Sequence, residues 1–159
     1  MKTINVKINW QVPIPVDHFV YGLTLYERII SYRQNVVYYF EGTNDRKQRK
    51  IDIGQTTQSL FDRTKQHILK KDYLEGAPKE QTIRCGIVSI PDAPNVPINR
   101  ELLEQVEGEL IQYLSENMEE PYMLCNNNKT QDIDRTYNIV TIANIGNKGF
   151  MPQIIRIKI

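Results

Sequence analysis

The chain has 159 residues, 40% of them apolar and 25% charged, and its twenty Lys and Arg against nineteen Asp and Glu give a formal net charge of +1. This balance is that of a globular domain and excludes a disordered, collagen-like or disulfide-dependent chain. The near-neutral charge argues against a strongly basic polyanion binder and leaves room for a local basic patch. The length predicts a single domain over residues 1–159.

Sequence signals for membranes and export are the next feature. No apolar run approaches the roughly 20 residues that cross a bilayer, and the N-terminal residues alternate instead of forming the apolar stretch of a signal peptide. Cys85 and Cys125 lie far apart and match no metal-binding spacing. They are expected to be buried thiols in a reducing compartment, so we expect a cytoplasmic protein without membrane contact.

Hydrophobic periodicity predicts strands and helices in alternation. Residues 2–10 alternate apolar and polar side chains, as a half-buried strand does. A helix is expected over 23–33, with Leu25, Ile29 and Tyr32 on its apolar side. Later in the chain we expect strands over 36–40, 51–53, 83–90, 136–143 and 152–159, and helices over 59–71 and 100–116. The prolines between 91 and 97 predict an extended connector.

The order of these elements predicts the fold class. The strands over 36–40 and 51–53 should pair as an antiparallel hairpin across the polar loop 42–50. The strands over 136–143 and 152–159 should form a second hairpin. The expected fold is therefore α+β, with a small, mainly antiparallel sheet flanked by helices.

The helix over 59–71 has basic residues beside its apolar stripe. Thr57 or Ser59 can cap it. Arg63, His67 and Lys70 follow at spacings that place them on one stripe next to the buried one. A solvated basic face is one interpretation of this pattern. The other is a guanidinium and an imidazole that reach together into a cleft.

The helix over 100–116, capped by Asn99, has a carboxylate at the edge of its buried stripe. Glu107 falls among apolar side chains, whereas Gln105 and Gln112 are expected to point away from the core. A carboxylate in such surroundings is costly unless a cation or hydrogen bonds satisfy it. Its partner is expected to be either an arginine or a divalent metal ion.

Several segments together resemble the core of the GIY-YIG nuclease family. In chain order they are 36–40 (VVYYF), 52–57 (DIGQTT), 59–67 (SLFDRTKQH), 107–111 (EGELI) and 124–127 (LCNN). The first two resemble the family's two motif strands, and the third resembles the helix with its Arg and His. The last two resemble the helix whose Glu binds metal and the segment with its Asn. The resemblance covers about residues 36–130 and leaves 1–35 and 131–159 as extensions.

The resemblance implies a metal-dependent DNA endonuclease that hydrolyses phosphodiester bonds with Mg²⁺ or Mn²⁺, as a monomer or a homodimer. Glu107 would hold the metal ion, which stabilises the leaving oxygen. Arg63 would bind the scissile phosphate through its planar fork. Tyr38 would be the general base, with a pKa lowered by nearby cations, and His67 would assist it or bind a phosphate.

The second motif has Asp52 where the family has a tyrosine. Asp52 either orients the attacking water in place of the phenol, or repels the substrate and leaves a nucleic-acid-binding module without catalysis. Gly54 and Asn126 are expected to be structural. A third interpretation, supported by the near-neutral charge, is an interaction protein with no nucleic-acid role.

A basic cluster lies in the loop between the two motif strands. It is either a solvated loop or a surface that contacts backbone phosphates without reading sequence. The residues expected to contact DNA are Arg46, Lys47, Arg49, Lys50, Lys70 and Gln55.

Overall fold

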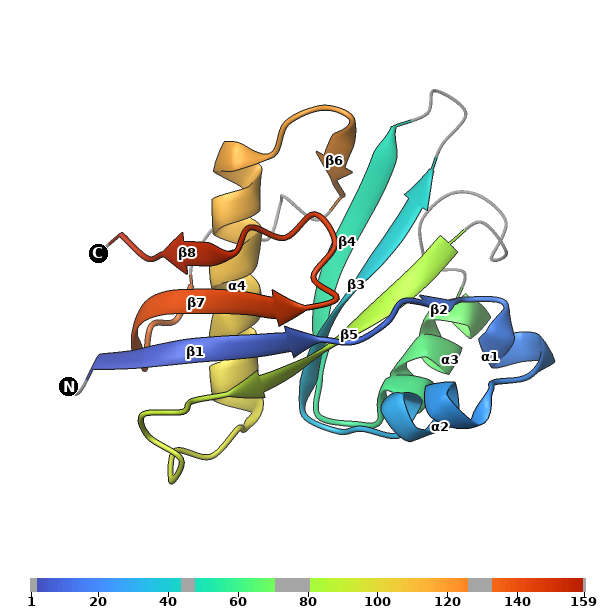
Figure 1. Cartoon of the computed structure of the whole chain (residues 1–159), viewed down its shortest axis with the longest axis horizontal. Helices are drawn as coiled ribbons and strands as arrows, with labels where there is room; N and C mark the ends of the chain where they lie inside the picture. Colours follow the sequence, from blue (N-terminus) through green and yellow to red (C-terminus); the bar gives the residue numbers. More distant parts are fainter. Residues whose placement is uncertain (1–2, 44–47, 71–80, 126–132, 159) are drawn as a thin grey trace.

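The computed structural model describes residues 3–43, 48–70, 81–125 and 133–158 of the chain. Within these residues, one curled and mostly antiparallel sheet is packed against helices (Figure 1). The mixed architecture with a mainly antiparallel sheet, expected from the sequence, is confirmed.

The described part of the sheet contains eight strands. They are β1 (Thr3–Trp10), β2 (Ile14–Pro15), β3 (Val36–Thr43), β4 (Arg49–Thr56), β5 (Gln81–Ser89), β6 (Tyr122–Leu124), β7 (Asn138–Gly146) and β8 (Ile154–Arg156). Their order is β6-β4-β3-β5-β1-β7-β8, and β2 pairs with β5. Strands β1 and β7 are parallel, as are β4 and β6. Both predicted hairpins are present, β3 with β4 and β7 with β8.

The two terminal segments belong to this same sheet. Strand β1 lies between β5 and β7, with eight-residue alternation of exposed and buried side chains. The segments that we expected as extensions of a nuclease-like core therefore supply the β1, β7 and β8 side of the sheet (Figure 1).

Four helices lie in the described residues. They are α1 (His18–Tyr21), α2 (Leu25–Ser31), α3 (Leu60–Lys70) and α4 (Arg100–Asn117). The predicted cap at Asn99 is confirmed, and of the two candidates for α3, Thr57 and Ser59, the capping residue is Ser59. The Ser59 hydroxyl accepts a hydrogen bond from the backbone N–H of Asp62 at 3.0 Å, and the Asn99 side chain accepts one from the N–H of Leu102 at 3.0 Å. Each cap satisfies a backbone donor at a helix N-terminus.

Two apolar cores form on the sheet. The larger one joins strand side chains such as Trp10 and Tyr39 to the leucines of α4. The smaller one joins Tyr38 and Phe40 of β3 to apolar residues of α1, α2 and α3, including Leu60. Successive side chains of a strand point to opposite faces, so the neighbours Tyr38 and Tyr39 lie in different cores.

The apolar side that we predicted for the helix over 23–33, which the structure contains as α2, is wrong. Leu25 is 76% exposed and Ile29 is 62% exposed, whereas Ile30 is only 4% exposed. Tyr32, just after α2, is exposed as well. The Thr24 hydroxyl and the buried Glu27 carboxylate form a reciprocal capping box at the start of α2, so polar side chains occupy part of its inward face.

Other local expectations also change. Residues 91–97 form turns instead of one extended connector, with backbone hydrogen bonds from Ala93 to Ile90 and from Val96 to Ala93. Cys85 is buried as predicted, but Cys125 is exposed. Strand β6 was not predicted. No helix in the described residues has both the length and the apolar character needed to cross a lipid bilayer.

Candidate functional site

Tyr38, Arg63 and His67 meet between β3 and α3. The Tyr38 hydroxyl lies 3.0 Å from Nε2 of His67. Nε of Arg63 donates a hydrogen bond to the same hydroxyl at 3.2 Å. His67 is buried, whereas Arg63 is half-buried. The basic stripe of α3 is thus not a solvated face at these two positions, because both side chains are turned toward one phenol.

The hydrogen bonds assign a direction to the cluster. Arginine has only donors, so the Tyr38 oxygen must accept from Arg63. The Tyr38 proton can then be donated to Nε2 of a neutral His67. In this arrangement the phenol is a relay between a guanidinium and an imidazole.

Gly54 makes room for this phenol. Its backbone pairs directly with Tyr38 across β3 and β4. A Cβ atom at Gly54 would lie 2.5 Å from the Tyr38 hydroxyl oxygen, so the ring extends across the backbone of β4. Any side chain at this position would displace the ring. The structural role predicted for Gly54 therefore has a steric cause.

The pKa of Tyr38 is raised to about 12, mainly by burial; Arg63 lowers it, and the charges of Glu107 and Asp52 add smaller increases that are included in this value. The sequence-based expectation of a lowered pKa is therefore wrong for the protein alone. The phenol holds its proton at neutral pH, because removal from water disfavours the phenolate more than Arg63 favours it.

The two acidic residues of the candidate site lie near this phenol, since both act electrostatically on it. Asp52 belongs to β4, and its backbone pairs with Phe40 on the strand of Tyr38. Glu107 is half-buried on α4. Strand β6 pairs with β4 only along 49–51, so in the described residues the second half of β4 has no further strand beside it. Helix α4, which carries Glu107, packs in the larger core, whereas Tyr38 belongs to the smaller one.

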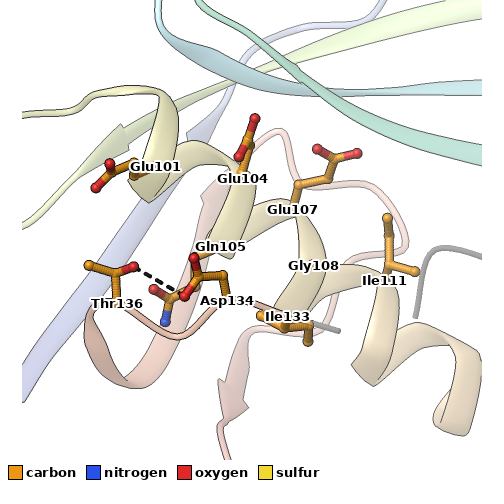
Figure 2. A pocket seen from close by; sticks show the side chains of 9 residues that line it. All are labelled: Glu101, Glu104, Gln105, Glu107, Gly108, Ile111, Ile133, Asp134 and Thr136. Atoms are coloured by element: carbon orange, nitrogen blue, oxygen red, sulfur yellow. Dashed lines mark hydrogen bonds between the residues drawn. The ribbon is translucent and has the colours of Figure 1, made fainter. Parts of the chain in front are cut away.

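Glu107 also lines a hollow on the outer side of α4 together with Glu101, Glu104 and Asp134. Figure 2 shows the Glu107 carboxylate directed away from Asp134 and toward the neighbouring strands. Within the described ranges, no three His, Cys, Asp or Glu side chains form a metal-binding group. Mg²⁺ usually keeps several waters and takes one or two carboxylates plus substrate phosphates, so the single carboxylate of Glu107 would be the ligand from the protein.

A polar pocket adjoins the cluster. The side chains that line it are Gln55, Thr56, Thr57, Gln58, Arg63 and Arg100. Arg63 thus belongs to both features. Its Nε donates to the Tyr38 hydroxyl, and its side chain also lines the pocket. Two guanidiniums and several amides or hydroxyls form a lining that suits phosphate oxygens.

No family model, curated protein or solved structure matches the chain. The likeness to the GIY-YIG core therefore remains a prediction from the motif residues. What the structure adds is their arrangement, with Tyr38, Arg63 and His67 in direct contact.

The fully buried carboxylate of α4 is Glu109, not Glu107. Glu109 is 3% exposed and accepts a hydrogen bond from Nε of Arg135 at 2.7 Å. Glu109 therefore has an arginine partner, which was one of the two alternatives expected for Glu107. Gln105 is buried too, against expectation, and exchanges hydrogen bonds with the backbone of Tyr137.

The predicted DNA-contacting residues are only partly covered by the structure. Arg49 is exposed and forms an ion pair with Glu41 at 2.8 Å, and Lys50 is half-buried on the same strand. Arg46, Lys47 and Asn126 lie outside the described residues, as does the side chain of Lys70.

Sequence reasoning missed Arg100 and Gln58. Arg100 is the first residue of α4, and Gln58 precedes α3. Helix propensity and periodicity give no signal for either, because pocket-lining residues before a helix or in its first turn do not follow the helical stripe.

Proposed function

We propose that the protein is a metal-dependent endonuclease of the GIY-YIG type that hydrolyses phosphodiester bonds of DNA. The observation that supports this most directly is the double position of Arg63. It donates to the Tyr38 hydroxyl and lines the polar pocket, so a phosphate in that pocket would bind the same guanidinium that contacts the phenol. A phosphate on Arg63 would be connected through the Tyr38 hydroxyl to the His67 imidazole. Such a series of groups suits the activation of a water molecule.

In the proposed reaction, Arg63 binds non-bridging oxygens of the scissile phosphate and stabilises the charge that grows in the transition state. The attacking water transfers a proton to the Tyr38 oxygen as the Tyr38 proton moves to Nε2 of His67. This relay needs no free phenolate, which matches a Tyr38 pKa of about 12. The water oxygen bonds to phosphorus, the bond to the leaving oxygen breaks, and that oxygen takes a proton from solvent. A Mg²⁺ or Mn²⁺ ion held by Glu107, when bound, supplies charge neutralisation at the phosphate and the leaving oxygen.

The test is cleavage of a supercoiled plasmid with Mg²⁺ or Mn²⁺. Arg63→Ala and Glu107→Gln should each lower the cleavage rate at least about a hundredfold, because each removes transition-state stabilisation. Arg156→Ala and Glu116→Gln are matched controls, since both residues are exposed and lie outside the proposed site. Wild-type rates in both Arg63→Ala and Glu107→Gln would refute the proposed activity.

A nucleic-acid-binding module without catalysis is the second candidate. The observation that favours it is Asp52, whose negative charge acts on the phenol and repels phosphate. This candidate predicts salt-sensitive DNA binding with no cutting under Mg²⁺ or Mn²⁺. Neutralising Arg46, Lys47, Arg49 and Lys50 together should then weaken binding, and undiminished binding would count against it.

The proposal also specifies the partner, the oligomeric state and the compartment of the enzyme. DNA is the partner, the protein acts as a monomer or a homodimer, and the compartment is the cytoplasm. Cys85 and Cys125 form no disulfide, which agrees with a reducing compartment.

A further inference from the structure

Arg100 is the first residue of α4. It lines the polar pocket together with Arg63, which belongs to α3. We propose that Arg100 and Gln55 bind a second phosphate of the DNA strand, next to the scissile phosphate on Arg63. This inference rests on the proposed function and specifies how the site positions its substrate. Arg100 would be a positioning residue, because it touches a phosphate at which no bond breaks.

The chemistry of the pocket lining favours an anion with several oxygens. None of the six lining residues is acidic, and two are arginines from different helices. Two guanidiniums that line one pocket repel each other, and the negative charge of phosphates bound in the pocket offsets this repulsion. Phosphate oxygens match the planar donor fork of arginine better than a compact halide or a single carbonyl does.

The Arg100 side chain is arranged to reach a ligand. Its Nε donates to Glu104 at 2.9 Å on the next turn of α4, and the side chain is 74% exposed. This bond uses only one edge of the guanidinium. Glu104 therefore orients Arg100 at the helix start and also competes with a bound phosphate for the same positive charge.

Gln55 provides a second partner for the phosphate. Its side-chain oxygen is buried, and no described residue donates a hydrogen bond to it. A buried amide oxygen without a donor is unfavourable. Rotation of the amide would instead place its NH₂ group there as a donor, and a phosphate oxygen in the pocket would accept from it.

Binding of a DNA duplex in EDTA, where no cutting occurs, tests the proposal by fluorescence anisotropy. Arg100→Gln should raise Kd about tenfold and reduce the slope of log K against log salt by about one, as loss of a single phosphate contact does. With Mg²⁺, the same variant should raise KM by a similar factor with a much smaller fall in kcat. Arg63→Gln should instead lose mainly kcat, because Arg63 contacts the reacting phosphate.

Glu104→Gln should change the affinity for DNA in the opposite direction to Arg100→Gln. Removing its competition for Arg100 should lower Kd for DNA about threefold, and this gain should disappear in the Arg100→Gln background. Glu101→Gln is the matched control, since it removes the same charge from the same helix while the ion pair of Arg100 is with Glu104, and it should shift Kd less. Equal gains from both substitutions would mean that only general electrostatics changed, and would overturn the specific pairing.

The outcomes separate this inference from the proposed function. Cleavage by the wild type together with unchanged Kd and salt slope in Arg100→Gln rejects the second phosphate site and leaves the endonuclease standing. Salt-sensitive binding that depends on Arg100, without cleavage, supports the phosphate site and rejects the endonuclease. Inorganic phosphate should compete with DNA for the wild type more strongly than for Arg100→Gln. Phosphate binding that depends on Arg100 without any DNA binding would show that the site takes free phosphate instead.

Discussion

Tyr38 and Gly54 are paired across β3 and β4, and the phenol ring of Tyr38 occupies the space where a side chain at Gly54 would lie. The contact is close enough that a Cβ atom would be 2.5 Å from the hydroxyl oxygen. This oxygen is also the one that bonds to Arg63 and His67. The glycine therefore determines where the central hydroxyl of the candidate site is held.

Gly54→Ala should move the Tyr38 ring and break its hydrogen bonds. We expect a loss of about 1–3 kcal/mol in the free energy of unfolding, as for other overpacked core positions. Urea denaturation measures this loss, and the NMR shifts of the His67 ring report the lost contact. Gly108→Ala is the contrast, because a Cβ atom added at Gly108 would meet only the side chain of Ile133, at 3.1 Å. It should stay within about 1 kcal/mol of wild type, since alanine also favours the helix.

Tyr38→Phe should change how stability depends on alkaline pH. The folded-state pKa of Tyr38 is raised by burial from 10.0 to about 12, so its contribution is complete below pH 10 and is lost as the pH rises from 10 to 12. The loss should reach about 1 kcal/mol near pH 11 and somewhat more than 2 kcal/mol beyond pH 12.

Urea denaturation between pH 8 and 11 compares the wild type with Tyr38→Phe. At pH 8 the variant should be less stable by about 1–2 kcal/mol, because it lacks the bonds to Arg63 and His67. Toward pH 11 the difference should shrink, since the phenylalanine does not titrate. A constant difference across this range would mean that Tyr38 has no raised pKa.

Local sequence patterns were sufficient for the frame of the site. The alternation in β1, the β-branched and aromatic run of β3 and the caps at Ser59 and Asn99 each predicted an element that the structure contains. The spacing of Arg63 and His67 placed both side chains on one stripe of α3, and the structure turns both toward Tyr38. These features depend on residues close together in the chain, so a single sequence contains them.

Features that depend on distant partners were missed. Periodicity placed Glu107 at the core edge but did not show that Glu109 is buried, because Arg135, far along the chain, makes that burial acceptable. The raised pKa of Tyr38 follows from the tertiary packing of α3 on β3. No local pattern in the sequence reports either effect.

Ile30 and Ile29 test the corrected face of α2. Ile30 is 4% exposed and its neighbour Ile29 is 62% exposed. Ile30→Ala should cost about 2–4 kcal/mol in the free energy of unfolding, as truncation of a buried isoleucine does. Ile29→Ala should stay within about 0.5 kcal/mol of wild type. Urea denaturation decides between this arrangement and the opposite one, in which the ranking of the two variants would be reversed.

Gln105 and Gln112 provide a similar comparison on α4. Gln105 donates to the backbone oxygen of Tyr137 at 2.7 Å and accepts from its N–H at 2.9 Å. Gln105→Ala leaves both backbone groups without this partner and should cost about 2–3 kcal/mol. Gln112→Ala, at a more exposed position, should cost less than about 0.5 kcal/mol. Equal effects in chemical denaturation would contradict the inward position of Gln105.

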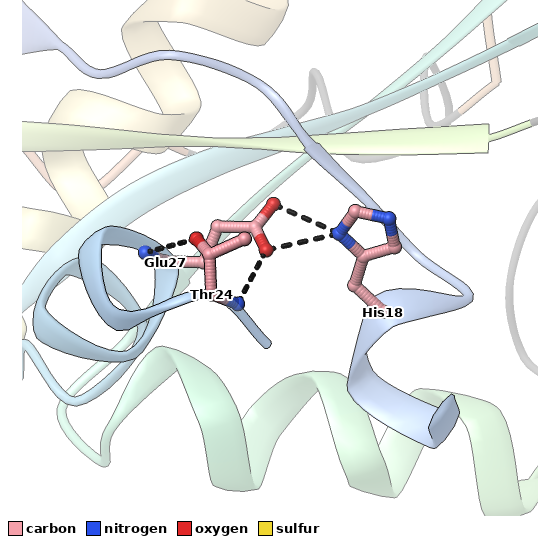
Figure 3. A network of polar contacts seen from close by, with 3 residues as sticks. All are labelled: His18, Thr24 and Glu27. Carbon is pink, nitrogen blue, oxygen red and sulfur yellow. Dashed lines mark hydrogen bonds and ion pairs between the residues drawn. The ribbon is translucent and has the colours of Figure 1, made fainter. Parts of the chain in front are cut away.

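Glu27 should make the N-terminal helices sensitive to acid. Nδ1 of His18 lies 2.9 and 3.0 Å from the two carboxylate oxygens of Glu27, and the Thr24 N–H donates to the same carboxylate (Figure 3). Burial of the carboxyl raises the pKa of Glu27, but the hydrogen bonds from Thr24 and His18 and the charge of His18 outweigh it, so the pKa lies below 4.5. A lowered folded-state pKa contributes stability above the unfolded-state pKa, and this stability is lost as the pH falls through the folded-state pKa.

Glu27→Gln removes this titration and retains the size of the side chain. Between pH 7 and pH 3, the wild type should lose more stability than Glu27→Gln, which is measured as the shift of the urea midpoint with pH. At pH 7 the variant should be the less stable of the two, because a neutral amide is a weaker partner for His18 and for the Thr24 N–H. His18→Ala should reduce the same acid response without changing the capping box. Parallel acid curves for the wild type and both variants would show that the contacts of Glu27 contribute nothing to folding.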